Sequence, residues 1–192
     1  KFPADPIKPD QKKINLIAKA ISEAKNPIII CGGAIKNSFA EEELKKLVEK
    51  LNIVLATSVT GKGTLEDDHP NSLGVVGSNG GSIYTREVLK NSDLVIFIGC
   101  RAGSVTTEKW QYPSSKSKII HIDIDPKVLG ANYKTYISLV ADAKNSLIQL
   151  NKKVKKNNFY GDEIVRKTKR KKFAEFNRLC KEEEGLIKPE RI

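Results

Sequence analysis

Short runs of consecutive apolar residues alternate along this chain with segments in which apolar residues recur every three or four positions. An apolar run without alternation predicts a strand buried on both faces, whereas the three-to-four spacing predicts an amphipathic helix. The predicted strands are Pro27–Cys31, Ile53–Ala56, Leu73–Val76, Leu94–Ile98, Lys118–Ile124 and Ile137–Val140. Three predicted helices have clear bounds: Gln11–Lys25, Ser82–Lys90 and Glu163–Glu184. A further helix follows a capping box at Ser38–Glu41 and carries Leu44, Leu47, Val48 and Leu51 on one face. Another runs from its cap at Asp142 toward Asn151.

The alternation of strands and helices predicts the fold class. Strands separated by helical segments are typical of a parallel sheet, so we expect an α/β fold with a doubly wound, Rossmann-like sheet of six strands. Pro27–Cys31 and Leu94–Ile98 are apolar throughout and are both followed by glycine. We therefore expect these two strands to lie side by side at the centre of the sheet.

Length and composition fit one main domain. The 192 residues are 39% hydrophobic and 30% charged, which is typical of a globular protein. Residues 1–9 form a proline-rich lead-in, residues 10–151 carry the α/β pattern, and residues 152–192 are expected to form a basic linker and a helix. The apolar runs are too short to cross a bilayer and no secretory signal is present, so we expect a cytoplasmic protein without membrane contact. The chain lacks methionine, and we expect it to be a processed chain or an excised fragment.

The net charge of +11 is concentrated toward the C-terminus, where residues 152–172 hold ten basic residues and two acidic ones. Such a run predicts either a solvated linker and helix or a nucleic-acid-binding surface. Few aromatic rings are interleaved with the charges, which disfavours RNA binding through base stacking. The last predicted helix has few apolar anchors, Phe173, Phe176 and Leu179, so we expect it to contact something outside the main core.

Two strand ends carry glycines that favour a ligand pocket. Gly32 and Gly33 follow one central strand, and Gly99 precedes Arg101 at the end of the other. Glycine lets a backbone approach a ligand closely, and a guanidinium suits a diphosphate. The alternatives are ordinary strand ends and a surface ion pair of Arg101. The spacing GxGxxG is absent, which disfavours an ordinary NAD dehydrogenase.

Acidic side chains end a third strand. Asp123 and Asp125 follow an apolar run, where an acid either binds ribose hydroxyls or caps the next turn. His121 lies nearby, but no cysteine or second histidine accompanies it, which disfavours a zinc site. The Thr60–Gly63 loop lacks the Walker spacing, so Lys62 either contacts a phosphate as a point charge or is solvated.

The cysteine, tryptophan and tyrosine side chains considered next are expected to have structural roles. Cys31 and Cys100 end apolar strands and are expected to be inert core residues. Three scattered cysteines fit a reducing compartment and no disulfide framework. Trp110, with Tyr112, is expected to pack a long loop.

The chain resembles the central domain of thiamine-diphosphate-dependent enzymes of the acetolactate synthase and pyruvate oxidase type. The resemblance rests on five segments that occur in this order, PIIICGGA, LATSVTGKGTLEDDHPNSLGVVG, DLVIFIGCRAG, KIIHIDIDPKVLGANY and VADAKNSL. It covers roughly residues 10–150, and the tail GLIKPERI is similar to the start of the diphosphate-binding domain that follows in this family.

This resemblance implies a carboligase or decarboxylase, a transferase or lyase that uses thiamine diphosphate and Mg²⁺ and forms a homodimer or homotetramer. The catalytic site would need a pyrimidine domain and a diphosphate domain that this sequence lacks, so the chain alone is expected to be inactive. Gly161-Asp162-Glu163 does not match the magnesium motif. In the family, the central domain binds FAD, ADP or nothing. The matching positions are Gly32, Gly33, Thr60, Gly61, Lys62, Gly63, Gly77, Gly99, Arg101, Asp123, Asp125 and Asp142.

The sequence departs from the flavin-binding pattern of the family at two loops. Ala102–Val105 replaces charged residues, and Val75–Asn79 replaces a bulkier set. A bound adenine nucleotide or an empty groove is therefore as consistent with the sequence as a flavin. Two functions of other classes stay open: a freestanding NAD-dependent enzyme such as a protein deacylase, which would need a zinc-binding cysteine quartet, and an RNA-binding protein that uses residues 152–172.

Overall fold

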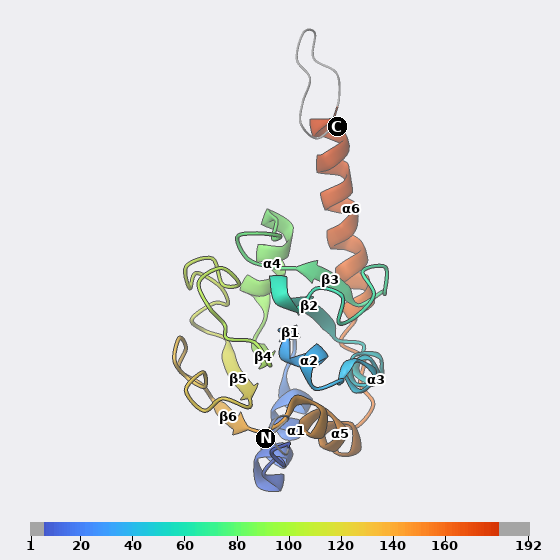
Figure 1. Ribbon diagram of the computed structural model, residues 1–192. Coiled ribbons are helices and arrows are strands. Elements are labelled where there is room, and N and C mark those ends of the chain that lie inside the picture. The colour runs from blue at the N-terminus through green and yellow to red at the C-terminus, as the bar shows by residue number, and fades with distance from the viewer. Residues whose placement is uncertain (1–5, 181–192) are drawn as a thin grey trace.

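The computed structural model describes residues 6–180, which form a single six-stranded parallel sheet with helices on both faces (Figure 1). The strands are β1 (Pro27–Cys31), β2 (Val54–Thr57), β3 (Ser72–Val75), β4 (Leu94–Ile98), β5 (Lys118–Asp123) and β6 (Ile137–Val140). The helices are α1 (Gln11–Glu23), α2 (Ala34–Asn37), α3 (Glu41–Leu51), α4 (Ile83–Asn91), α5 (Ala143–Lys153) and α6 (Gly161–Leu179), with a 3-10 turn, η1, at Val59–Gly61.

The strand order is β3-β2-β1-β4-β5-β6, which confirms the doubly wound topology and the central position of β1 and β4. Their register runs from Pro27 opposite Leu94 to Cys31 opposite Ile98, so both strands end at the same level. Every residue of the two strands is buried, because helices cover both faces. This burial is the physical reason for their uninterrupted apolar sequences.

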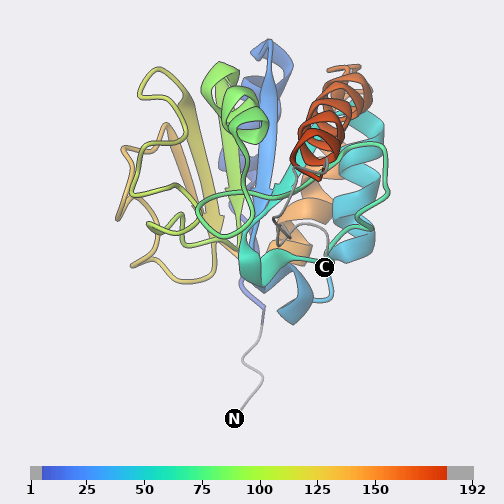
Figure 2. The same ribbon diagram turned by 90° about the horizontal axis from the view of Figure 1, so that it is seen from above.

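The two faces of the sheet have separate cores. On one face, α1, α3 and α5 pack over Ile29, Ile96 and Ile120, and on the other, α4 and α6 pack over Ile28 and Phe97. Figure 2 shows the same layers from above. None of the helices within residues 6–180 has both the length and the apolar character needed to span a membrane.

Side-chain caps explain the starts of three of the six α-helices within residues 6–180. Asp10 and Asp142 accept backbone N–H bonds at the starts of α1 and α5, and Ser82 forms a capping box at α4. The predicted capping box at Ser38 is wrong. Ser38 Oγ instead donates to the carbonyl of Ala34 at 2.8 Å, which closes the short helix α2, and α3 begins without a side-chain cap.

The loop between β4 and β5 is irregular, as predicted, but Trp110 does not pack it. That side chain is 52% exposed. The loop is held instead by Tyr112, whose carbonyl accepts a 2.6 Å hydrogen bond from the Tyr133 hydroxyl, and by an ion pair between Arg86 of α4 and Glu108 at 2.7 Å. Of the two aromatic residues expected to pack the loop, Tyr112 packs against the core and Trp110 does not.

Helix α6 is anchored at its start and projects beyond the sheet at its end (Figure 1). Val165 is 1% exposed against the sheet, whereas Phe173 and Phe176 are 66% and 48% exposed. The first half of α6 therefore belongs to the core, and only its second half fits the prediction of contacts outside it. Glu184, the predicted end of this helix, lies outside the described residues.

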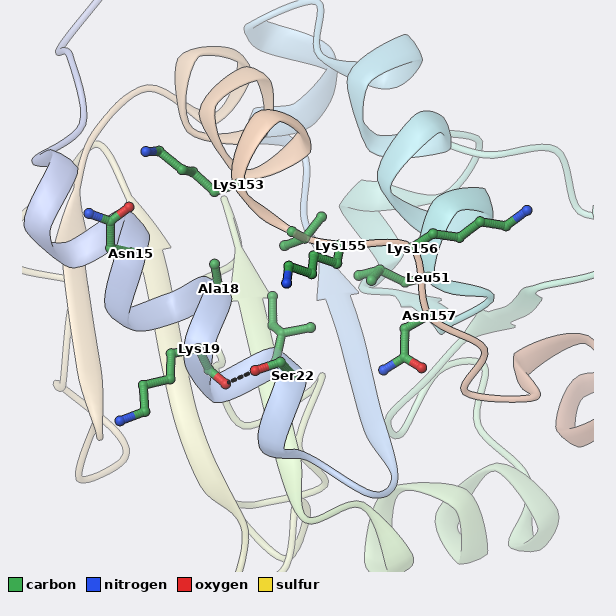
Figure 3. A pocket seen from close by; sticks show the side chains of 11 residues that line it. Asn15, Ala18, Lys19, Ser22, Leu51, Lys153, Lys155, Lys156 and Asn157 are labelled. Carbon is green, nitrogen blue, oxygen red and sulfur yellow. Dashed lines mark hydrogen bonds between the residues drawn. The ribbon is translucent and has the colours of Figure 1, made fainter.

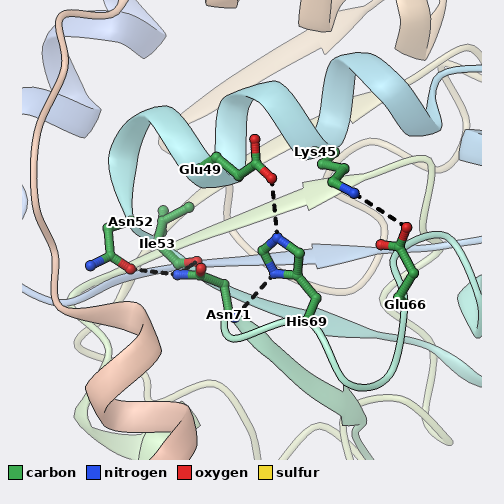
Figure 4. A network of polar contacts seen from close by, with 7 residues as sticks. All are labelled: Lys45, Glu49, Asn52, Ile53, Glu66, His69 and Asn71. Carbon is green, nitrogen blue, oxygen red and sulfur yellow. Dashed lines mark hydrogen bonds and ion pairs between the residues drawn. The ribbon is translucent and has the colours of Figure 1, made fainter.

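A polar network joins the end of α3 to the loop before β3 (Figure 4), and Asn52 extends it to the start of α6. Asn52 has a left-handed backbone, with φ 44°, and its side chain accepts from Asn71 Nδ2 at 2.6 Å and from the Asp162 N–H at 3.1 Å. The Asn71 N–H donates to His69 Nδ1 at 3.2 Å, and His69 Nε2 lies 3.4 Å from Glu49 Oε1. This network fixes the direction in which α6 leaves the domain.

Candidate functional site

A groove lies at the carboxyl ends of β1, β2, β4 and β5. The chain winds outward from β1 in one direction and from β4 in the other, so this edge of the sheet is the topological switch point at which α/β folds bind ligands. The groove has a volume of about 710 Å³. Its lining residues are Gly33, Ala34, Asn37, Ser58, Val59, Thr60, Cys100, Arg101, Gly103, Ser104, Val105, Thr106, Asp123, Asp125 and Val128.

Two glycines line this groove. A side chain at Gly103 would project into open space, with no atom within 4 Å of its Cβ, and one at Gly33 would meet Thr60 at 3.3 Å. The backbone of Gly103 does not have a positive φ, so its conformation does not require glycine. The missing side chain instead leaves space in the groove. A ligand that lies against residues 103–106 would use this space.

The other glycines at the strand ends serve packing. A Cβ at Gly32 would collide with the carbonyl oxygen of Gly99, and a Cβ at Gly99, whose φ is +57°, would come within 2.5 Å of Ala34 Cβ. A Cβ at Gly61 would lie 2.5 Å from the Cys31 carbonyl oxygen. These glycines let β1, β4 and η1 approach one another closely, and none of them lines the groove.

The loop between β3 and α4 supports the groove wall from outside. A Cβ at Gly77, whose φ is +92°, would collide with the carbonyl oxygen of Val105. That carbonyl accepts a 2.8 Å hydrogen bond from the Ser78 N–H. Backbone contact between the two loops therefore holds the wall formed by Val105, and Gly77 has no direct exposure to the groove.

Arg101 supplies the positive charge of the groove. It is exposed, its carbonyl accepts from Asn132 Nδ2 at 3.1 Å, and its side chain has no ion-pair partner among residues 6–180. The alternative of a surface ion pair for Arg101 is therefore wrong for the part of the chain that the structure describes. A guanidinium without a carboxylate partner is suited to bind an anionic ligand.

Asp123 and Asp125 line the groove on the side opposite η1 and also cap their own turn. One oxygen of Asp123 accepts from the Asp125 N–H at 3.0 Å, and one of Asp125 accepts from the Lys127 N–H at 2.9 Å. Each carboxylate has a second oxygen for further hydrogen bonds, so the capping and ligand-binding interpretations are compatible. Asp142 has a separate place, since it caps α5 by accepting from the Asn145 N–H at 2.9 Å.

The polar turn after β2 contributes Ser58 and Thr60 to the groove. Their hydroxyl oxygens lie 3.1 Å apart, and Ser58 Oγ also accepts from the Gly61 N–H at 3.2 Å. Lys62 and Gly63 lie outside the groove, and Lys62 faces α6 instead. Sequence reasoning missed Ser58, although its position directly after a buried strand is the same signal that identified Gly33 and Arg101.

His121 and the two strand-end cysteines are positioning and core residues. The buried His121 Nε2 donates to the Cys100 carbonyl at 2.8 Å, and burial lowers the pKa of this imidazole, so it holds the strand end as a neutral ring. Burial also raises the pKa of Cys31 to about 12 and that of Cys100 to about 11, which keeps both thiols protonated. Across residues 6–180 no cluster of three or more His, Cys, Asp or Glu side chains is arranged to hold a metal ion.

A second hollow, of about 440 Å³, lies between α1 and residues 153–157 (Figure 3). Lysines surround it, but Figure 3 shows the amino groups of Lys19, Lys153 and Lys156 pointing away from one another, and only that of Lys155 near the centre. Its floor residues Ile21 and Leu51 are almost fully buried. The hollow therefore lacks the converging polar groups that a ligand site needs.

The fold and the switch-point groove place the chain among the Rossmann-like α/β domains. Residues 14–150 match the family described as "Thiamine pyrophosphate enzyme, central domain", and the chain belongs to this family. It is 43% identical over 133 residues to a probable acetolactate synthase large subunit of Methanococcus aeolicus, a match that covers 69% of this chain and 22% of that protein.

Bacterial and plant proteins give the same result. The identity is 32% over 143 residues to an acetolactate synthase of Mycobacterium leprae, covering 74% of this chain and 23% of that protein. The identity is 33% over 147 residues to a chloroplastic acetolactate synthase of Arabidopsis thaliana, and this match covers 77% of this chain and 22% of that protein. The chain thus spans less than a quarter of the length of these relatives, and none of these matches supports an NAD-dependent deacylase or an RNA-binding protein.

Proposed function

We propose that this chain is the central domain of a larger thiamine-diphosphate-dependent carboligase or decarboxylase, and that its groove binds an adenine nucleotide. The parent enzyme would carry its pyrimidine and diphosphate domains in other parts of the polypeptide, hold thiamine diphosphate with Mg²⁺ there, and act as a cytoplasmic homodimer or homotetramer. The family match and the short span relative to the acetolactate synthases support this role. The domain division at residues 9–10 and 151–152 stays a prediction.

The observation that carries the nucleotide proposal is the set of charged and hydroxyl side chains that line the switch-point groove. Arg101, whose guanidinium has no ion-pair partner within residues 6–180, lines it together with the hydroxyls of Ser58 and Thr60, and the carboxylates of Asp123 and Asp125 also line it. Phosphates fit the first group, and ribose hydroxyls fit the second. The volume of about 710 Å³ is large enough for a nucleotide.

The same wall disfavours a flavin. Ala102 is buried, Gly103 has no side chain, and Ser104 and Val105 offer a single hydroxyl to a ring system. An isoalloxazine would therefore gain few hydrogen bonds beyond those of the shared ADP moiety. We expect ADP to bind more tightly than FAD for this reason, and NAD to bind no better than FAD.

Calorimetry with ADP, FAD and NAD tests the proposal on three variants. Arg101→Ala should weaken ADP binding by roughly 1.5–3 kcal/mol, the usual worth of a hydrogen bond to a charged group. Gly103→Leu should abolish binding by filling the groove while leaving the thermal stability unchanged, because open space surrounds that position. Arg178→Ala, at the far end of α6, is the matched loss of one arginine and should bind like the wild type.

Two results would contradict the nucleotide proposal. One is ADP binding that is indifferent to Arg101 and Gly103, which would place the ligand elsewhere on the molecule. The other is FAD binding that is clearly tighter than ADP binding. If none of the three nucleotides bound, the nucleotide-binding proposal would be refuted, whereas the family assignment would be unaffected.

A further inference from the structure

A second groove runs between the edge strand β3 and the distal half of α6, and it meets the switch-point groove at Val59. It has a volume of about 650 Å³. Leu73 and Val75 of β3 line one side, Phe173 and Phe176 of α6 line the other, and Lys62 and Lys172 stand among them. A Cβ at Gly74 would meet no atom within 4 Å, so the floor of the groove is open.

The apolar side chains of this groove are unusually exposed. Phe173 and Phe176 stand three positions apart on one side of α6, and both are more exposed than any apolar residue of the first half of the helix. Within residues 6–180, β3 pairs with β2 alone, so its outer edge carries no further strand. An edge strand beside two exposed aromatic rings is typical of a site that binds a polypeptide segment.

Charge decides which kind of segment fits. Lys62 and Lys172 have no ion-pair partner in the described part of the chain, whereas nearby Lys169 donates to the Asp67 carbonyl at 2.7 Å. Residues 166–179 hold seven basic residues against Glu175 alone. A second copy of this chain would bring the same positive charge into the groove, so self-association is disfavoured.

A bilayer with anionic headgroups and a nucleic acid would also match the positive charge, but both fit the shape and the apolar lining of the groove less well than a polypeptide does. A bilayer is flat, whereas these rings line a concave groove between a helix and a strand. A nucleic acid would have to stack its bases in a groove whose other side is lined by the apolar Leu73 and Val75. A polypeptide segment satisfies both features, because it can place apolar side chains and carboxylates at alternate positions.

We propose that this groove is a docking site for an acidic, apolar segment of a partner protein. Leucine or phenylalanine side chains of the segment would pack on Phe173 and Phe176, and its carboxylates would pair with Lys62 and Lys172. The proposal is separate from nucleotide binding, since Phe173, Phe176, Lys62 and Lys172 do not line the switch-point groove, although the two grooves share Val59.

The test uses two synthetic amphipathic peptides with the same leucine and phenylalanine positions, one with glutamate and one with lysine on the polar face. Fluorescence anisotropy of the labelled peptides measures binding to the full chain. The glutamate peptide should bind at least about tenfold more tightly than the lysine peptide, because like charges in an interface are strongly repulsive. Its affinity should fall several-fold near 1 M salt, where the Debye length is about 3 Å.

Three variants locate the binding. Phe173→Ser with Phe176→Ser should lose the glutamate peptide, and these exposed positions are expected to leave the circular dichroism spectrum and melting temperature unchanged. Lys62→Glu with Lys172→Glu should lose the glutamate peptide and gain the lysine peptide. Leu16→Ser on α1 removes an equally exposed apolar side chain from the other face of the sheet and should bind like the wild type.

Several outcomes would overturn the proposal. Equal affinity for both peptides, no binding of the glutamate peptide, or binding that is unchanged in the double phenylalanine variant would each remove it. Tighter binding to phosphatidylserine vesicles or to a single-stranded oligonucleotide, lost in that same variant, would assign the surface to a membrane or a nucleic acid. A dimer in sedimentation that dissociates in this variant would assign it to a second copy.

Discussion

Replacing Asn52 should detach the start of α6 from the rest of the domain. The Asn52 side chain makes four hydrogen bonds: it accepts from Asn71 and from the Asp162 N–H, and its Nδ2 donates to Asn158 Oδ1 and Asp162 Oδ1, both at 2.7 Å. Asn71 keeps one partner in the variant, because its Nδ2 also donates to the Ile53 carbonyl at 3.1 Å. The substitution therefore removes hydrogen bonds from several groups, and some of these groups can form hydrogen bonds with water instead.

The magnitude follows from these bonds and from the backbone. A net worth of about 0.5–1.5 kcal/mol for each bond, at the lower end for those that solvent reaches, gives a loss of roughly 2–4 kcal/mol. Asn52→Gly tests this loss alone, since glycine keeps the left-handed conformation at no steric cost. Asn52→Ala adds about 1–2 kcal/mol, because a Cβ is unfavourable at φ 44°.

Urea denaturation of the wild type and the two variants measures these differences. The wild type should be the most stable, Asn52→Gly less stable and Asn52→Ala the least. Limited proteolysis should cut within α6 first in both variants, because that helix loses its anchor. Equal stability of the alanine and glycine variants, or a loss below 1 kcal/mol in the glycine variant, would refute the view that the side chain of Asn52 holds α6.

The pH dependence of the Asn52 variants provides a second check. The hydrogen bond from Asn52 is the main cause that lowers the pKa of Asp162 below its ordinary value. A carboxylate with a lowered pKa in the folded state contributes stability above its unfolded pKa, and this stability is lost as pH falls through the folded pKa. Asn52→Gly should therefore show a smaller loss of stability in this acidic range than the wild type does.

Further predictions concern the core and the activity. The buried Thr57 hydroxyl has no hydrogen-bond partner in the described part of the chain, so Thr57→Val should raise the unfolding free energy by about 1 kcal/mol, and a loss in urea denaturation would contradict this. A thiol reagent at pH 8 should reach Cys31 and Cys100 only after unfolding, because both thiols are buried and burial raises the pKa of each; rapid labelling of either in the folded chain would argue against burial. The purified chain with pyruvate, thiamine diphosphate and Mg²⁺ should form no acetolactate, acetaldehyde or carbon dioxide above the blank, and product formation would refute the assignment as a non-catalytic domain.

The sheet was predictable because its pattern is local. Pro27–Cys31 and Leu94–Ile98 have no polar position, and only a strand covered on both faces tolerates that sequence. Their shared glycine ends then placed them together at the switch point. The start of α3 was less predictable, because the positions of Ser38 and Ala40 depend on contacts with α2 that no short pattern reveals.

The candidate site was predictable in position and less so in detail. Arg101 and Asp123 were found because strand ends of a parallel sheet converge at one edge. The roles of Gly32 and Gly99 were hidden, since a side chain at Gly32 would collide with the end of β4 and one at Gly99 would collide with Ala34 of α2, and both are tertiary contacts. Gly103 shows the opposite case, in which the missing side chain opens the groove.

The central claim is that the groove at the carboxyl ends of β1 and β4 binds an adenine nucleotide. Titration of ADP into the ¹⁵N-labelled chain, followed by two-dimensional NMR, tests it most directly. The account predicts saturable shifts of the backbone amides of Gly33, Thr60, Arg101 and Gly103, with the residues around the hollow between α1 and 153–157 unchanged. An unchanged spectrum, or shifts confined to that hollow, would contradict it.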